Sequence, residues 1–99
     1  MNTMTTNAQQ RLSARITGRV QGVGFRHFTT VNARRLGVDG WVRNEPDGSV
    51  RLESEGPREA LDDLLEAVHQ GPRSARVDDV SAEWDAAEGA FDTFEVRYH

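Results

Sequence analysis

The sequence predicts an α+β domain in which two helices cover one face of an antiparallel sheet. Three observations lead to this fold class. With 99 residues, the chain is long enough for one domain with one hydrophobic core. Several short segments alternate apolar and polar residues, as half-buried strands do. Two longer segments repeat apolar residues at helical spacing and stop at a glycine, which is a common end of a helix.

The first strand is predicted by the alternation of Leu12, Ala14 and Ile16 with polar neighbours. The preceding residues 1–10 carry no charged side chain, and they lack the basic start and apolar run of a signal peptide. We therefore expect residues 1–10 to form a disordered N-terminal tail and residues 11–99 to form the domain.

The first helix is predicted to begin at Phe25, because Phe28 and Leu36 then fall on the same side of it. Gly37 is a natural C-terminal stop for this helix. Strand character returns over residues 38–45, so we expect the chain to pass directly from the helix into a second strand.

A hairpin and a second helix follow. Proline and glycine make a tight turn at residues 46–48, since Pro46 presets φ and Gly48 permits a positive φ. Residues 50–54 are then the partner strand, and Pro57 suits the first turn of a helix. An apolar stripe at positions i, i+3, i+4 and i+7 marks the buried side of that helix: Leu61, Leu64, Leu65 and Val68.

Two further strands are predicted near the C-terminus. Their alternating residues are Val80, Ala82 and Trp84, then Phe94, Val96 and Tyr98. Val77 is out of phase with Val80, which indicates a β-bulge at residues 78–79. The order is that of a ferredoxin-like β-α-β-β-α-β sandwich with one extra short strand near the C-terminus. This fold hosts many functions, so it does not by itself indicate a chemistry.

Composition excludes several classes of site. The chain has no cysteine, which rules out disulfides, thiolate metal sites and thiol nucleophiles. All twelve basic residues are arginine, so no Schiff-base or P-loop lysine exists. Residues 11–51 carry eight arginines against three acidic residues, net +5, while residues 52–99 are net −9. This asymmetry favours a small anion site over a broad nucleic-acid surface.

The segment between the first strand and the first helix is rich in glycine. Gly18, Gly22 and Gly24 would let backbone N–H groups turn toward an anion, and the helix that follows adds its own N-terminal N–H groups. Arg26 lies in the first turn of that helix and could close over the same anion. A flexible strand-to-helix turn with Arg26 as a solvated charge would explain the same residues.

A second group of candidate residues lies at the end of the second strand. Asn44 is uncharged and could either begin the turn or serve a binding site. Trp41 and Trp84 are expected in the core. The three histidines are scattered without ligand spacing, so we expect no metal site.

Residues 16–26, ITGRVQGVGFR, resemble the first signature of the acylphosphatase family at every characteristic position. Residues 40–44, GWVRN, with Gly48 and Gly56 beyond them, resemble its second signature, and the C-terminal FEVRY is similar too. The resemblance covers roughly residues 11–98. It implies a ferredoxin-like enzyme that hydrolyses acyl phosphates to a carboxylate and inorganic phosphate.

The resemblance also implies roles for individual residues. Arg26 and Asn44 would be catalytic, with Arg26 binding the phosphoryl group and Asn44 positioning the attacking water. Backbone N–H groups of the loop would bind the phosphoryl group as well, which makes the substrate-binding residues Gly18, Arg19, Val20, Gln21, Gly22, Val23 and Gly24. Two residues, His27 and Glu45, depart mildly from the commonest family pattern, and the negative charge of Glu45 is expected to lie beside the anion.

These residues offer neither a general base nor a nucleophile, because arginine stays protonated and asparagine does not ionise. The site could still orient the reactants and stabilise phosphoryl charge, if the substrate itself brings a good leaving group. Two alternatives are a non-catalytic phosphate- or anion-binding regulatory module on the same fold and a single-stranded RNA binder.

The expected partners follow from the enzymatic interpretation. They are a small acyl phosphate as substrate and inorganic phosphate as product and inhibitor. We expect a cytoplasmic, metal-independent monomer with no organic cofactor, and no binding of nucleic acid or membrane.

Overall fold

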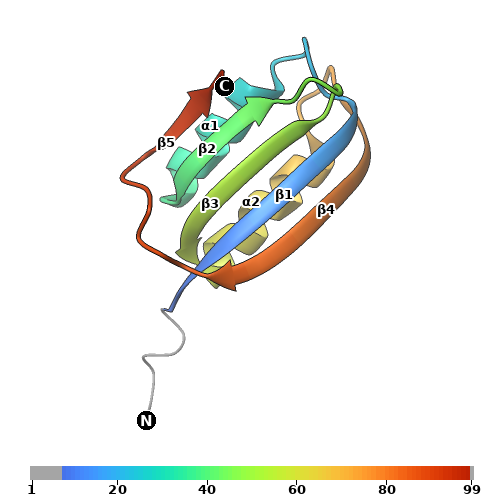
Figure 1. Ribbon diagram of the computed structural model, residues 1–99. Helices are drawn as coiled ribbons and strands as arrows, with labels where there is room; N and C mark the ends of the chain where they lie inside the picture. Colours follow the sequence, from blue (N-terminus) through green and yellow to red (C-terminus); the bar gives the residue numbers. More distant parts are fainter. Residues whose placement is uncertain (1–7, 99) are drawn as a thin grey trace.

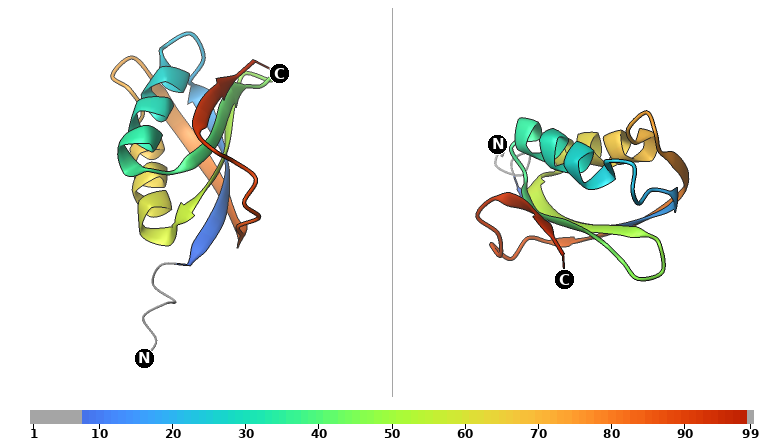
Figure 2. Two further views of the ribbon diagram at one scale, coloured as in Figure 1. Left: turned by 90° about the vertical axis from the view of Figure 1, so that its left-hand side faces the viewer. Right: turned by 90° about the horizontal axis from the view of Figure 1, so that it is seen from above.

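The computed structural model describes residues 8–98 and has two layers, a five-stranded sheet with both helices on one of its faces (Figures 1 and 2). In chain order the elements are β1 (Gln9–Arg19), α1 (Phe25–Leu36), β2 (Asp39–Asn44), β3 (Val50–Pro57), α2 (Arg58–Gln70), β4 (Arg76–Ala86) and β5 (Phe94–Arg97). Across the sheet the strand order is β4-β1-β3-β2-β5. This arrangement confirms the predicted ferredoxin-like fold with its extra C-terminal strand.

The sheet is mixed, so the prediction of a purely antiparallel sheet was wrong at one edge. Strands β1 to β4 pair antiparallel, but β5 pairs parallel with β2, from Gly40 opposite Phe94 to Arg43 opposite Arg97. In Figure 1 the chain leaves β4, crosses the end of the sheet and returns beside β2. Alternation of apolar residues predicts a strand but carries no information on its direction.

Strand β1 is longer than the sequence predicted at both ends. It begins at Gln9, where Gln9 pairs with Pro57, so the predicted tail is too long by two residues. Residues 1–7, for which we expect disorder, lie outside the described residues. At its other end β1 continues through Gly18 and Arg19, which pair with Val77 and Arg76 of β4.

The predicted β-bulge is confirmed where β1 pairs with β4. Thr17 pairs with Asp79 and Gly18 with Val77, which leaves Asp78 without an opposite residue. A Cβ on Gly18, whose φ is 128°, would come 2.2 Å from the Arg76 carbonyl oxygen. The close approach of the two backbones therefore requires glycine here.

The helices bury only part of the residues predicted to face the core. On α2, Leu61, Leu64 and Val68 are buried, whereas Leu65 is partly buried. On α1 the buried residues are Phe25, Thr29, Thr30 and Ala33, whereas Phe28 and Leu36 are only partly buried. Each buried threonine donates its hydroxyl to the carbonyl oxygen four residues before it, which satisfies a polar group inside the protein.

The two tryptophans lie on opposite faces of the sheet. Trp84 packs against the helix-covered core, as expected, with the guanidinium of Arg58 3.6 Å from its ring. Trp41 is buried, with 7% exposed, but it lies outside that core. Because neighbouring Val42 points into the core, Trp41 points to the uncovered face. Three arginine side chains cover its ring there: Arg43, Arg51 and Arg97.

Candidate active site

The loop between β1 and α1 consists of residues 20–24 and takes its shape from two glycines. Gly22 and Gly24 have φ angles of 76° and 80°, a conformation that other residues rarely adopt. Gly24 is the N-cap of α1, and no side chain caps the helix. The first helical hydrogen bond runs from the Phe28 N–H to the Gly24 oxygen at 3.0 Å. The N–H groups of residues 25–27 therefore remain available at the helix N-terminus.

The side chain of Gln21 ties this loop to the hairpin between β2 and β3. Its Nε2 donates to the carbonyl oxygens of Glu45 and Ser49, both at 2.8 Å. The turn of the same hairpin is fixed by Asp47, which accepts hydrogen bonds from the Ser49 N–H at 3.0 Å and hydroxyl at 2.6 Å. These two bonds from Ser49, with the guanidinium of Arg15, hold the pKa of the Asp47 carboxyl well below its usual range.

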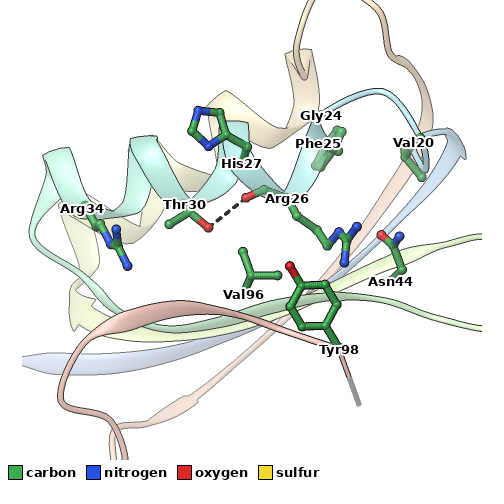
Figure 3. A pocket seen from close by; sticks show the side chains of 11 residues that line it. Val20, Gly24, Phe25, Arg26, His27, Thr30, Arg34, Asn44, Val96 and Tyr98 are labelled. Carbon is green, nitrogen blue, oxygen red and sulfur yellow. Dashed lines mark hydrogen bonds between the residues drawn. The ribbon is translucent and has the colours of Figure 1, made fainter.

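The loop, the helix and the hairpin together form a pocket of about 510 Å³. Arg26 of α1 and Asn44 at the end of β2 both line it (Figure 3). Gly22 and Gly24 line it as well. The two polar side chains thus face the same space as the glycine-rich loop. Their spacing in the sequence could not predict this proximity, because Asn44 follows Arg26 by eighteen residues, across the rest of α1 and all of β2.

Arg26 has an aromatic neighbour and forms no ion pair within the described residues. Its Cζ lies 5.0 Å from the centre of the Tyr98 ring, a cation–π distance. Over residues 8–98, every ion pair between an arginine and a carboxylate involves an arginine other than Arg26. Its guanidinium donors are therefore available to a ligand in the pocket.

The structure divides the predicted substrate-binding residues into three groups. Val20, Gly22 and Gly24 line the pocket. The Gln21 side chain holds the loop to the hairpin and Val23 packs against the core, so only their backbone groups could meet a ligand. Gly18 and Arg19 belong to β1 and do not line the pocket, because the bulge lets the strand continue past Thr17.

Several pocket residues were missed in the sequence: Phe25, His27, Thr30, Arg34, Val96 and Tyr98. Arg26, Thr30 and Arg34 repeat at i, i+4 and i+8, which places them along one side of α1. That spacing could have been recognised in the sequence as a polar stripe on the helix. The pocket residues on and after β5 could not have been predicted, since their place depends on where the last strand joins the sheet.

The negative charge of Glu45 is partly compensated by an ion pair that the sequence did not predict. Its Oε2 accepts a hydrogen bond from Arg43 Nε at 2.5 Å, so the carboxylate forms an ion pair with a cation outside the pocket. Glu45 does line a shallower hollow beside the pocket, together with Arg26, Asn44 and Tyr98. Its carboxylate is thus near the anion site but partly neutralised.

The described residues hold neither a cluster of metal ligands nor a membrane-spanning helix. Among residues 8–98, no three histidine, aspartate or glutamate side chains gather closely enough to hold a metal ion. Within the same residues, no helix has the length and apolar character that crossing a membrane requires.

On this α+β sandwich, the pocket combines free N–H groups at a glycine loop and a helix start with an arginine that has no ion pair within residues 8–98. These features suit a small anion. Residues 12–96 match the family model described as Acylphosphatase. A curated acylphosphatase from Salinibacter ruber is 65% identical over 94 residues, 95% of this chain and 99% of the relative.

Solved structures agree with this relationship. The crystal structure of acylphosphatase from Bacillus subtilis superposes with a TM-score of 0.87 at 36% identity, covering 90% of this chain and 99% of the other. An acylphosphatase structure from Coxiella burnetii has the same TM-score at 33% identity, covering 98% and 100%. The chain belongs to the acylphosphatase family, which confirms the resemblance found in the sequence.

Proposed function

We propose that this chain hydrolyses acyl phosphates in the pocket formed by residues 20–24, α1 and the end of β2. Arg26 and the N–H groups of the loop and of the helix start bind the phosphoryl group, and Asn44 positions the attacking water. The observation that carries the proposal is that Arg26 and Asn44 line one pocket while Arg26 has no acidic partner among the described residues. Family membership supports the reaction class.

The pocket suits a substrate that needs orientation more than proton transfer. Water forms a bond to phosphorus while the bond from phosphorus to the acyl oxygen breaks, and the carboxylate leaves with that electron pair. The proton of the water passes to a phosphoryl oxygen of the substrate itself. Arg26 and the N–H groups stabilise the charge on the remaining phosphoryl oxygens. A phosphate monoester leaves as a far more basic alkoxide and should react poorly.

Substitution of Asn44 tests whether this residue positions the water while Arg26 binds the phosphoryl group. We expect Asn44→Ala to lower turnover of benzoyl phosphate by about two orders of magnitude, since it removes an orienting group that acts in the transition state. Affinity for inorganic phosphate should stay near wild type, because Asn44 is assigned to the water. Turnover is followed by release of phosphate, and affinity by the thermal shift that phosphate produces.

Other outcomes of that assay would contradict the proposal. Near-normal turnover in Asn44→Ala would leave Asn44 as a turn residue. Wild-type protein that is stabilised by phosphate but hydrolyses no acyl phosphate would instead be a non-catalytic anion-binding regulatory module.

The same proposal includes a cytoplasmic monomer that needs no metal and is inhibited by its product, inorganic phosphate. In this interpretation Arg26 and backbone N–H groups supply the positive charge that a metal ion supplies in other phosphoryl-transfer sites. Turnover should therefore be unchanged by EDTA. Loss of turnover with EDTA and its return with Mg²⁺ would contradict this part of the proposal.

A further inference from the structure

The pocket extends well past the proposed phosphoryl site, as a groove between α1 and β5. One wall is the side of α1 that carries Arg26, Thr30 and Arg34, and the other is β5 with Val96 and, just beyond it, Tyr98 (Figure 3). Arg34 follows Arg26 by eight positions on the helix, so their backbones lie about 12 Å apart along the axis. The groove is longer than a phosphoryl group requires.

The far end of this groove carries a second cation. The Arg34 Nε and Nη2 donate to the carbonyl oxygen of Phe94 at 3.2 and 2.9 Å, which fixes the guanidinium against the start of β5. Its Nη1 is not used in these bonds. Within residues 8–98, no carboxylate forms an ion pair with Arg34. Arg34 thus combines a fixed position with donors that face the groove unopposed.

The middle of the groove has a different character from its ends. Thr30 is only 7% exposed, and its hydroxyl donates to the Arg26 carbonyl oxygen at 2.8 Å. Across from the helix, Val96 offers an apolar surface. A ligand with charge at both ends and an uncharged chain between them would match this pattern of cation, neutral surface and cation.

We propose that Arg34 binds a second anionic group at the far end of the acyl chain, so that the preferred substrates are acyl phosphates of acids with a terminal carboxylate or phosphate. The inference rests on the proposed function, since it requires the acyl phosphate to be held by Arg26. Arg34 then acts as a specificity-determining residue. An acyl phosphate without a distal anion can still react but gains nothing from Arg34.

Two substrates of equal carbon number test the inference. Glutaryl phosphate carries a terminal carboxylate, and pentanoyl phosphate carries a methyl group in its place. The readout is the ratio of kcat/KM for glutaryl over pentanoyl phosphate in each protein. Wild type should favour glutaryl phosphate, and Arg34→Gln should lower this ratio about tenfold, as expected for loss of a charge-assisted hydrogen bond. Most of the change should appear in KM for glutaryl phosphate.

The neighbouring Arg35 supplies a matched control on the same helix. Arg35 is exposed, bonds Asn32 and does not line the pocket. Arg35→Gln removes the same net charge, so it should leave the substrate ratio unchanged. Arg34→Lys keeps a cation at the far end and should retain part of the preference for glutaryl phosphate.

The outcomes separate this inference from the proposed function. A wild-type protein that hydrolyses neither substrate contradicts the proposed function. Hydrolysis of both with a ratio that Arg34→Gln does not alter, even if both activities fall together, overturns the role of Arg34 and leaves the proposed function intact. An equal fall of the ratio in Arg34→Gln and Arg35→Gln would mean that only net charge matters, and would also overturn it.

Discussion

Arginines line the pocket and also cover the helix-free face of the sheet, but their neighbours differ. On the sheet face five arginines have a carboxylate partner, in the pairs Arg11–Glu53, Arg11–Glu55, Arg15–Asp47, Arg43–Glu45, Arg51–Glu53 and Arg97–Glu95. In the pocket, Arg26 meets the ring of Tyr98 and Arg34 meets a backbone carbonyl. Positive charge is therefore neutralised on the sheet face and left available in the pocket.

The comparison shows that residue type alone does not mark an anion site. The first half of the chain is net +5, yet part of that charge is neutralised by acidic residues from elsewhere in the sequence, Glu53 and Glu55 among them. What distinguishes the pocket is that two arginines without a carboxylate partner in the described chain, Arg26 and Arg34, line it together.

The largest effect on turnover is expected for Arg26→Lys in the pocket, and Arg51→Lys on the sheet face is its control. Arg26→Lys keeps the charge but loses the planar fork that can hold two phosphoryl oxygens. We expect turnover to fall about 100-fold or more, nearly as far as in Arg26→Ala. Arg51→Lys changes the same residue type on the sheet face and should turn over substrate like wild type.

Half of wild-type turnover in Arg26→Lys would show that charge alone suffices. Both variants should keep the native fold, since neither side chain belongs to the hydrophobic core. Far-UV circular dichroism and a thermal melt check this point.

A substitution on the sheet face should instead affect stability. Glu55 is only 7% exposed, and its carboxylate accepts hydrogen bonds from the N–H groups of Glu88, Gly89 and Ala90 at 2.8, 3.0 and 3.2 Å. It thereby fastens the connection that leads from β4 to β5. We expect Glu55→Gln to lower the free energy of unfolding by about 1–3 kcal/mol, measured in urea at pH 7.

Exposed Glu59 on α2 provides the control, because Glu59→Gln removes the same charge without a buried network. An equal loss of stability in both variants would show that net charge matters and the contacts do not.

The same carboxylate predicts how stability depends on pH. Burial opposes ionisation, but the N–H donors of Glu88, Ala90 and Gly89, with Arg11, outweigh it and lower the pKa of Glu55. A lowered pKa in the folded state means that this stabilisation is complete above the unfolded value of about 4.3 and is lost as the pH falls through the folded value. Wild type should lose stability below about pH 5, and Glu55→Gln should show a shallower slope.

The smallest effect is expected for Glu45→Leu. The sequence predicts repulsion between this carboxylate and the bound anion, so its removal should tighten phosphate binding. Since Arg43 already pairs with Glu45 at 2.5 Å, we expect a gain of less than about threefold at low salt. A phosphate titration by calorimetry measures it, and a gain of tenfold or more would show that the Arg43 pair leaves the carboxylate charge effective at the site.

Much of the fold was predictable because local patterns determine it. The stripe on α2, the turn at residues 46–48 and the bulge near Asp78 each depend on residues close together in sequence. The direction of β5 and the length of β1 were not predictable, since both depend on pairing with strands distant in the sequence.

The same distinction applies to the site. The sequence pattern made Arg26 and Asn44 candidates, and the family resemblance gave them their catalytic roles. The pocket they line joins a helix start to a strand end that the sequence keeps apart. Arg34 and Tyr98 were missed, because their place in the pocket depends on β5 lying beside α1. Glu45 was expected to face the anion, and its ion pair with Arg43 could not be read from spacing alone.

An NMR titration of the ¹⁵N-labelled protein with inorganic phosphate tests most directly whether anions bind at Arg26, which forms no ion pair within residues 8–98. The account predicts that the backbone amides of residues 20–27 and the Nε–H of Arg26 shift together and saturate at one phosphate concentration. The Nε–H signals of Arg15 and Arg51, which have carboxylate partners, should stay in place. Shifts at Arg15 or Arg51 as large as those at Arg26, or unshifted amides over residues 20–27, would contradict it.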